Sequence, residues 1–312
     1  MHEFKVVPFM RYLIPAVVVS ILLTVGSLGL LAFKGLNYGM DFTGGTRLEV
    51  SFQQAPDLDQ VRTVLRDAGY TNHEVIFYGT DTNVLVRLQD SADASETASG
   101  ETALRVVELL QEHIDADMQL EESGFVSSVG GDELREQGGL GMLVAMGMIM
   151  LYIALRFQFK FSVATVVGLF HDAILVLGFF ALTQLTFDLT VLAAVLAMVG
   201  YSLNDTIVVA DRIRENFRVL RGKDAKEIFD WSISQTLART VITSVTTILV
   251  LLALYYFGGE VVHGFSVTLI VGIIVGTSSS MYVVTVVLLL MNISKEDLMP
   301  PVRDKEELDS IP

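Results

Sequence analysis

The chain has 312 residues, of which 52% are hydrophobic and 18% charged, and its mean hydropathy is +0.54. This composition is too apolar for an ordinary soluble domain and indicates a membrane protein. The formal charge of −15 arises largely in one region, because residues 37–138 hold 20 Asp and Glu against 6 Arg. Cysteine is absent, which excludes a disulfide framework, a thiol nucleophile and a thiolate metal site.

Six stretches are apolar over about the 20 residues that a membrane-spanning helix requires. The first exceeds the apolar part of a usual signal peptide, and no small-x-small cleavage site follows it before Lys34, so we expect a retained anchor. The sequence therefore predicts a bundle of six membrane helices. They cover residues 12–33, 138–155, 161–183, 188–210, 240–258 and 264–291.

Lys and Arg in the short connections predict the orientation of the bundle. The connections after the third and fifth spans, residues 184–187 and 258–263, hold no Lys or Arg. Both termini are therefore expected in the cytoplasm, and residues 35–137 outside it. The basic residues on the cytoplasmic side are Lys5, Arg11, Arg156, Lys160, Arg212, Arg214, Arg218, Arg221, Lys223 and Lys226.

Residues 35–137 alternate between strand and helix patterns. Strands are expected over residues 46–52, 75–78, 84–88 and 118–129, with a hairpin loop at 79–83 and helices over 57–68 and 102–114. Asp57 is the expected N-cap of the first helix. This order is typical of a split βαβ, ferredoxin-like unit. The predicted fold is thus a membrane all-α six-helix bundle with one α+β ferredoxin-like domain inserted after the first helix.

The remaining segments complete the predicted domain plan. Residues 1–34 form the N-terminus and first span, and residues 138–292 form the other five spans. A cytoplasmic helical loop is expected over 211–239. The charged tail, residues 293–312, is expected to be disordered.

Ionisable groups inside a membrane are candidates for function because they are costly to bury. His171 and Asp172 lie near the middle of the third span, Asp205 lies nearer the cytoplasmic end of the fourth, and Arg239 begins the fifth. An Asp that faces an Arg at the cytoplasmic mouth can take up and release protons as helices move, and we favour this role for Asp205. The alternative is that these residues are polar contacts between helices and that Arg239 is a basic anchor, and for Asp172 both interpretations stay open.

The other polar and small residues predict no soluble-enzyme chemistry. The sequence has no phosphate loop and no His-Glu-x-x-His motif, and its five His are dispersed. No enzymatic activity, cofactor, metal or nucleic-acid partner is expected. Gly272, Gly276 and Ser278–Ser280 in the sixth span are interpreted as helix packing.

Five parts of the sequence form a set of recognisable motifs: 39–46 with Asp41, Gly44 and Gly45; 126–134; Phe170, His171 and Asp172; 200–216 with Asn204, Asp205 and Asp211; and Arg239 with Thr240. At this spacing they resemble the SecD/SecF family, and residues 200–216 resemble its SecF branch rather than its SecD branch. Ser127 stands where the family usually has Gly.

The resemblance implies an inner-membrane subunit that forms a complex with SecD and associates with the SecYEG channel and YajC. It also implies that the subunit couples the proton-motive force to late export of polypeptides, with residues 35–137 in the periplasm and membrane lipid around the spans. By the same resemblance, Asp205 and Arg239 fall at the carboxylate and arginine thought to serve proton passage.

Two rival functions stay open. One is half of a small-molecule exporter of the resistance-nodulation-division type, although such an exporter usually carries a fused second half and larger outer domains. The other is a scaffold that stabilises a partner and moves no protons. For Gly44 and Gly45, a hinge and a simple tight turn before a strand are both open.

Overall fold

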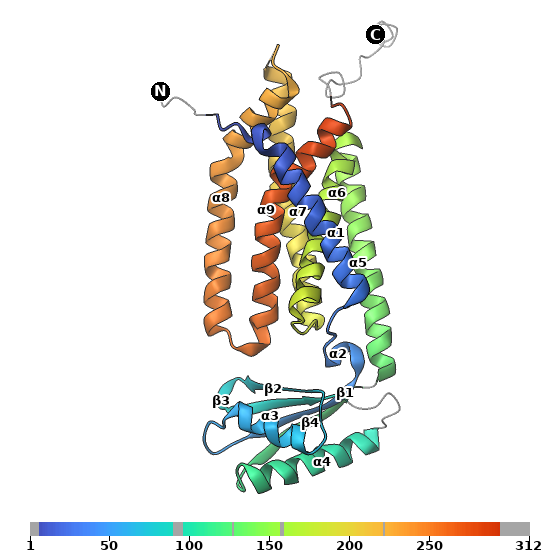
Figure 1. Ribbon diagram of the computed structural model, residues 1–312, viewed down its shortest axis with the longest axis vertical. Helices are drawn as coiled ribbons and strands as arrows, with labels where there is room; N and C mark the ends of the chain where they lie inside the picture. The colour runs from blue at the N-terminus through green and yellow to red at the C-terminus, as the bar shows by residue number, and fades with distance from the viewer. Residues whose placement is uncertain (1–5, 90–95, 127, 157–158, 221, 294–312) are drawn as a thin grey trace, which may run out of the picture.

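A computed structural model describes residues 6–89, 96–126, 128–156, 159–220 and 222–293 of the protein. A helical bundle forms one part, and a small sheet with two helices, the sheet domain, lies beyond one end of it (Figure 1). The start of α1 and the end of α9 lie at the end of the bundle away from the sheet domain. Apart from Ile293, the tail that was predicted to be disordered lies outside the described residues, as does Ser127.

All six predicted spans are confirmed as helices that are long and apolar enough to cross a membrane. A single turn, η1 (Phe9–Tyr12), leads into the first of them. The spans are α1 (Leu13–Phe33), α5 (Ser128–Arg156), α6 (Phe159–Thr183), α7 (Leu189–Val219), α8 (Ala225–Phe257) and α9 (His263–Leu290).

The stretch predicted as one helical loop, residues 211–239, is divided between the ends of α7 and α8. The two helices run past the expected span ends and leave only residues 220–224 between them. The Asn216 amide on α7 donates to the Ser232 hydroxyl and to Gln235 Oε1 on α8, each at 2.9 Å. The rings of Phe217 and Phe229 pack edge to face beside them. These contacts continue the helix pair beyond the apolar spans.

Helices α6, α7 and α9 form the inside of the bundle, whereas α1, α5 and α8 expose long apolar faces. Small residues allow close approach between the inner helices. A Cβ on Gly272 of α9 would collide with Met198 of α7, and a Cβ on Gly178 of α6 would collide with Ser27 of α1. The packing role expected for Gly272 is therefore visible as a direct helix contact.

The sheet domain shows the predicted order of strand, helix, strand, strand, helix, strand. Its antiparallel sheet has the order β2-β3-β1-β4. Asp57 caps α3 as expected, because its carboxylate accepts a hydrogen bond from the Asp59 N–H at 2.9 Å. The elements are β1 (Gly45–Ser51), α3 (Leu58–Asp67), β2 (His73–Tyr78), β3 (Thr80–Leu88), α4 (Glu96–His113) and β4 (Gln119–Val126).

Three local expectations differ from the structure. The loop predicted over residues 79–83 is a tight turn at Gly79, because β3 begins at Thr80 and continues the pairing. The strand predicted to reach Val129 ends at Val126, and Ser128 already belongs to α5. Helix α4 begins at Glu96 rather than Thr102, because Ser and Ala tolerate a helix in which Ser99 is buried against β1.

One face of the sheet packs on α3 and α4 through an apolar core, and the other face is turned toward the bundle (Figure 1). Arg87 and Glu74 lie on that second face and form an ion pair of 3.0 Å. Ile76 from the same face lines a cavity with Leu185 and Asp188, which join α6 to α7. The sheet domain therefore rests on the end of the bundle where α7 begins.

Candidate functional site

Asp172 is a fully buried carboxylate near the middle of α6. Its Oδ2 accepts hydrogen bonds from the Ser202 hydroxyl of α7 at 2.5 Å and from the Ser279 hydroxyl of α9 at 2.9 Å. A buried carboxylate is stable only when its oxygens are satisfied, and hydroxyl donors from two other helices satisfy one of them here. Asp172 thus joins the three inner helices.

His171 connects this carboxylate to α1. Its Nδ1 lies 2.9 Å from Asp172 Oδ1, and its Nε2 lies 2.7 Å from the Ser20 hydroxyl. When Asp172 is ionised, its oxygens only accept hydrogen bonds, and Nδ1 is then the ring nitrogen that donates to Asp172. In the neutral imidazole, Nε2 then accepts from Ser20. The predicted pair of ionisable groups in the third span is therefore part of a chain that crosses from α1 to α9.

Asp205 is the second buried carboxylate, and its oxygens are held by α8 and α9. The Thr240 hydroxyl donates to Oδ1 at 2.7 Å, and the Ser280 hydroxyl donates to Oδ2 at 2.9 Å. The side chain is 8% exposed, so it lies inside the bundle rather than against lipid. Each carboxylate is thus bound by donors on two helices other than its own.

The expected contact between Asp205 and Arg239 is not made among the described residues. Arg239 is exposed on α8, and the next residue, Thr240, is the one that faces Asp205. Successive helical residues point about 100° apart, so only one of the two can face the carboxylate. Arg239 instead lines a cavity of about 360 Å³ together with Asp211 and Glu215 of α7.

Asn204 and Asp211 are both exposed on α7, in contrast to the neighbouring Asp205. They lie seven residues apart, with Val208 between them, so they share one face of the helix. Val208 and Asp211 line the cavity that Arg239 also lines. The polar residues of this motif therefore separate into a buried acid and an outer polar face.

Four hydroxyl groups that bind the carboxylates were not predicted as site residues: Ser202, Thr240, Ser279 and Ser280. Their signal in the sequence is weak, because Ser and Thr are common in membrane helices and usually bond to their own backbone. Ser279 and Ser280 were interpreted as packing residues, and the structure assigns them to the two carboxylates.

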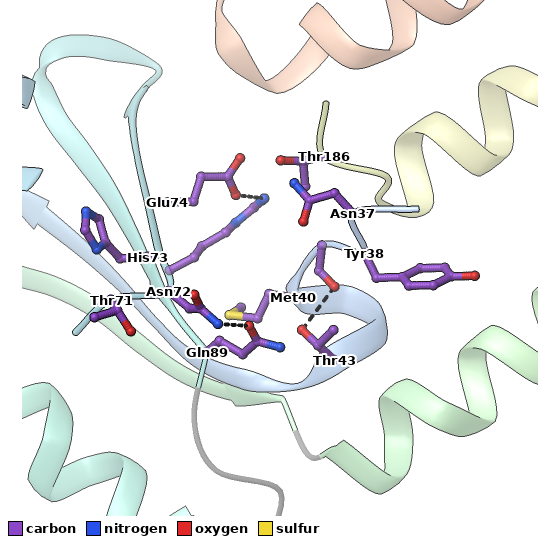
Figure 2. Close-up of a pocket in the computed structure, with 12 residues that line it drawn as sticks. Asn37, Tyr38, Met40, Thr43, Thr71, Asn72, His73, Glu74, Gln89 and Thr186 are labelled. Atoms are coloured by element: carbon purple, nitrogen blue, oxygen red, sulfur yellow. Dashed lines mark hydrogen bonds and ion pairs between the residues drawn. The ribbon is translucent and has the colours of Figure 1, made fainter. Parts of the chain in front are cut away.

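Asp41 connects the sheet domain to the bundle. It lies on a short helix, α2 (Met40–Thr43), which the sequence analysis did not predict. The Asp41 carboxylate accepts a hydrogen bond from the Leu189 N–H at the start of α7, at 3.1 Å. The backbone of Gly39 and Asn37 also bonds to Phe187. This connection, Thr186 and polar residues at the end of the sheet line a cavity of about 300 Å³. Figure 2 shows how these side chains are arranged.

Gly44 and Gly45 follow α2 and begin β1, and both have positive φ angles of 75° and 146°. A Cβ on Gly45 would also collide with the Leu88 carbonyl oxygen of β3. These two observations explain why glycine occupies the turn between α2 and the sheet.

Asp188, the N-cap of α7, is the second carboxylate at this junction. It accepts from the Val191 N–H at 2.7 Å. Burial is the largest influence on Asp188 and raises its pKa above the ordinary value. The hydrogen bond from Val191 and the charge of Arg87 lower this pKa, whereas the charges of Asp41 and Glu74 raise it. His263 lies in the same cavity of about 170 Å³. Asp188 at this junction therefore holds its proton more tightly than an ordinary aspartate does.

We expect Asp188→Asn to raise the thermal stability of the protein at neutral pH and to have less effect in acid. A carboxyl with a raised folded pKa destabilises the fold once it ionises, so this cost grows as the pH rises through that pKa and is absent below the unfolded value. Melting temperatures of the purified wild type and variant at about pH 7.5 and about pH 4 measure this difference in stability. Asp57→Asn, at an exposed cap, is the matched control. An equal effect at both pH values would contradict the prediction.

Comparisons with known proteins agree over most of the chain. A model of the C-terminal region of the protein export membrane protein SecD/SecF matches residues 106–294, and a model of the SecD/SecF GG motif matches residues 29–56. A protein translocase subunit SecF from Pseudomonas aeruginosa is 48% identical over 297 residues, which are 95% of each chain. One from Vibrio alginolyticus is 43% identical over 99% of this chain and 98% of its own.

Two solved SecDF structures are also similar to this chain. The crystal structure of SecDF from Thermus thermophilus, described as a translocon-associated membrane protein, matches with a TM-score of 0.78 and 35% identity. The match covers 94% of this chain and 40% of that chain. A second SecDF structure, in a super-membrane-facing form, matches with a TM-score of 0.71. The chain thus spans about 40% of the length of the first solved protein.

Proposed function

Because the chain belongs to the SecD/SecF family, in its SecF branch, we propose that it works with SecD and uses the proton-motive force to complete protein export. The export step is the translocation and release of exported proteins across the inner membrane. The names of its relatives support a role in protein translocation and name no catalytic activity.

The burial of Asp205 between three helices is the observation that carries the proton-driven part of this proposal. A proton gradient does work only if protonation changes the relative stability of two conformations. Asp205 in its ionised form accepts from Thr240 and Ser280. A protonated carboxyl carries one O–H that needs an acceptor inside the bundle, so the hydrogen bonding around Asp205 changes when a proton binds. Loading and unloading of Asp205 would thus alter the packing of α7 against α8 and α9.

The exposed residues of α7 and α8 form an outer polar face, defined by Asn204, Asp211 and Arg239. This face supports the proposal that a membrane partner covers it. An exposed amide at Asn204, inside the span, is unfavourable against lipid because lipid offers no hydrogen bonds. The matching solved chains carry SecD and SecF together, as their name SecDF indicates. We therefore propose that the membrane helices of SecD cover this face and supply partners for Asn204 and Arg239.

The absence of cysteine allows a direct test of that contact. A single cysteine at Asn204 is expected to cross-link to single cysteines placed in the membrane helices of SecD. A cysteine at Leu22, which is exposed on α1 away from this face, is the control and should not cross-link. Cross-links from Leu22 and none from Asn204 would place SecD on another face.

The remaining parts of the proposal concern orientation and partners. The connections rich in Lys and Arg argue for cytoplasmic termini, and residues 35–137 would then form a periplasmic domain of the ferredoxin-like class. Residues 1–34 and 138–292 would form the membrane part, and 293–312 a cytoplasmic tail. We propose that the periplasmic domain meets the exported polypeptide, and that the complex associates with SecYEG and YajC.

The whole proposal is tested in cells depleted of their own SecF-type subunit. This chain, supplied together with SecD, is expected to increase release of an exported protein several-fold, and only while the proton gradient is present. An ionophore that collapses the gradient supplies the comparison in the same cells. An equal increase with and without the gradient would leave a role as a scaffold and overturn the proton-driven mechanism.

A further inference from the structure

The two buried carboxylates are bound by consecutive residues of one helix. Ser279 of α9 donates to Asp172 Oδ2, and Ser280 donates to Asp205 Oδ2, each at 2.9 Å. A second connection runs through α7, where Ser202 donates to Asp172 and Asp205 follows one turn later. Asp172 and Asp205 are thus joined to each other through two helices, although no direct contact between them is needed.

Both serine hydroxyls have a second acceptor within reach. The Ser279 hydroxyl lies 3.3 Å from the Gly276 carbonyl oxygen, and the Ser280 hydroxyl lies 3.0 Å from the Thr277 carbonyl oxygen. A serine hydroxyl has one proton, so it donates either to the carboxylate or to its own helix. When Asp205 takes up a proton, its new O–H can donate to Ser280 Oγ, and the Ser280 proton turns to the Thr277 carbonyl.

The packing around α9 leaves little room for one contact to change alone. A Cβ on Gly276 would lie 2.9 Å from the Ser202 hydroxyl and 3.5 Å from Asp172 Oδ2, so α9 approaches both residues closely through this glycine. Ser279 and Ser280 share one rigid turn of backbone. A shift that adapts Ser280 to a protonated Asp205 therefore also moves Ser279 relative to Asp172.

We propose that Ser279 and Ser280 are positioning residues that couple the two carboxylates, so that proton uptake at Asp205 changes the hydrogen bonding of Asp172 and the reverse. The inference rests on the proposed proton-driven function, which it deepens by adding a second group and the element that links the two. It assigns Ser279 and Ser280 of α9 a role beyond packing.

Infrared difference spectroscopy on the purified full chain in lipid vesicles tests the coupling. The carbonyl band of a protonated carboxyl shifts when its hydrogen bonds change. Bands that appear on acidification are assigned by their loss in Asp172→Asn and Asp205→Asn. We expect Ser280→Ala to shift both the Asp205 band and the Asp172 band, and Ser279→Ala to do the same. Ser280→Thr, which keeps the hydroxyl, should restore the original positions.

Ser278→Ala is the matched control, because the exposed Ser278 hydroxyl bonds only to the Val275 carbonyl of its own helix among the described residues. It should shift neither band. If each serine variant moved only the band of its own carboxylate, or if Asp172 gave no band at any pH, the coupling would be overturned.

Export measurements separate this inference from the proposed function. We expect Ser280→Ala to lower gradient-dependent release by roughly tenfold, the effect of losing its one hydrogen bond to Asp205. If the serine variants shift both carboxyl bands but export does not depend on the gradient, the proposed function is overturned and the coupling stands. If each variant shifts only one band and export still depends on the gradient, only the coupling is overturned.

Discussion

Asp205→Asn is expected to abolish the gradient-dependent part of protein release while the subunit still folds and binds SecD. Asparagine keeps the size of the side chain and its Oδ1, so it can still accept from Thr240 on α8. Its amide cannot take up or release a proton, so the equilibrium that we propose the gradient drives is removed. Release in the variant should fall to the level of the wild type treated with an ionophore.

The measurement is release of an exported protein from cells that carry only the variant, with co-purification of SecD as the test of assembly. Glu227→Gln is the matched control, because Glu227 is an exposed carboxylate near the start of α8, outside the buried cluster. It should leave release unchanged. If Asp205→Asn releases protein as the wild type does, Asp205 is a packing residue, and any proton site lies in the partner.

Gly45→Ala is expected to have the largest effect on the sheet domain, with a loss of about 2–5 kcal/mol in local stability. The estimate combines about 1–2 kcal/mol for a side chain at positive φ with about 1–3 kcal/mol for overpacking. The added Cβ would collide with the Leu88 carbonyl, at the position where β1 pairs with β3. The strand has to move away from its neighbour to accommodate it.

Hydrogen exchange of the β1 and β3 amides in the full chain measures this loss, which corresponds to exchange roughly a hundredfold faster. Gly124→Ala in β4 is the control, because a Cβ there meets no heavy atom within 4 Å. It should change stability by less than about 0.5 kcal/mol. Similar exchange in both variants would show that the turn after α2 adapts to a side chain and that glycine is not required there.

Periodicity and composition were sufficient to predict most elements of this fold. The six spans and the order of strands and helices between the first two follow from apolar runs and alternation, which the local sequence contains. The bounds of α7 and α8 were missed because their polar ends are stabilised by contacts between the two helices, such as the one from Asn216 to Ser232. Helix α2 was missed because one turn of helix has no periodic pattern.

The candidate site was predicted in part. Asp172, His171 and Asp205 stand out as ionisable groups in apolar runs, and all three are held by side-chain hydrogen bonds inside the bundle. Which residue faces Asp205 depends on the rotation of α8 in the bundle, and a single sequence does not contain that rotation. Only the structure therefore shows that Thr240 rather than Arg239 faces Asp205. The same holds for Ser279 and Ser280, whose partners lie on other helices.

Helix α7 has a mechanical consequence for the molecule. It runs without a break from Leu189, whose N–H donates to the Asp41 carboxylate, past Ser202 and Asp205 to Val219. At about 1.5 Å per residue, its 31 residues make a rod of about 46 Å. A continuous α-helix resists compression along its axis because its backbone hydrogen bonds would have to break. A displacement of α7 along its axis by less than an ångström at Asp205 would therefore reach the start of the helix, beside the sheet domain, nearly undiminished.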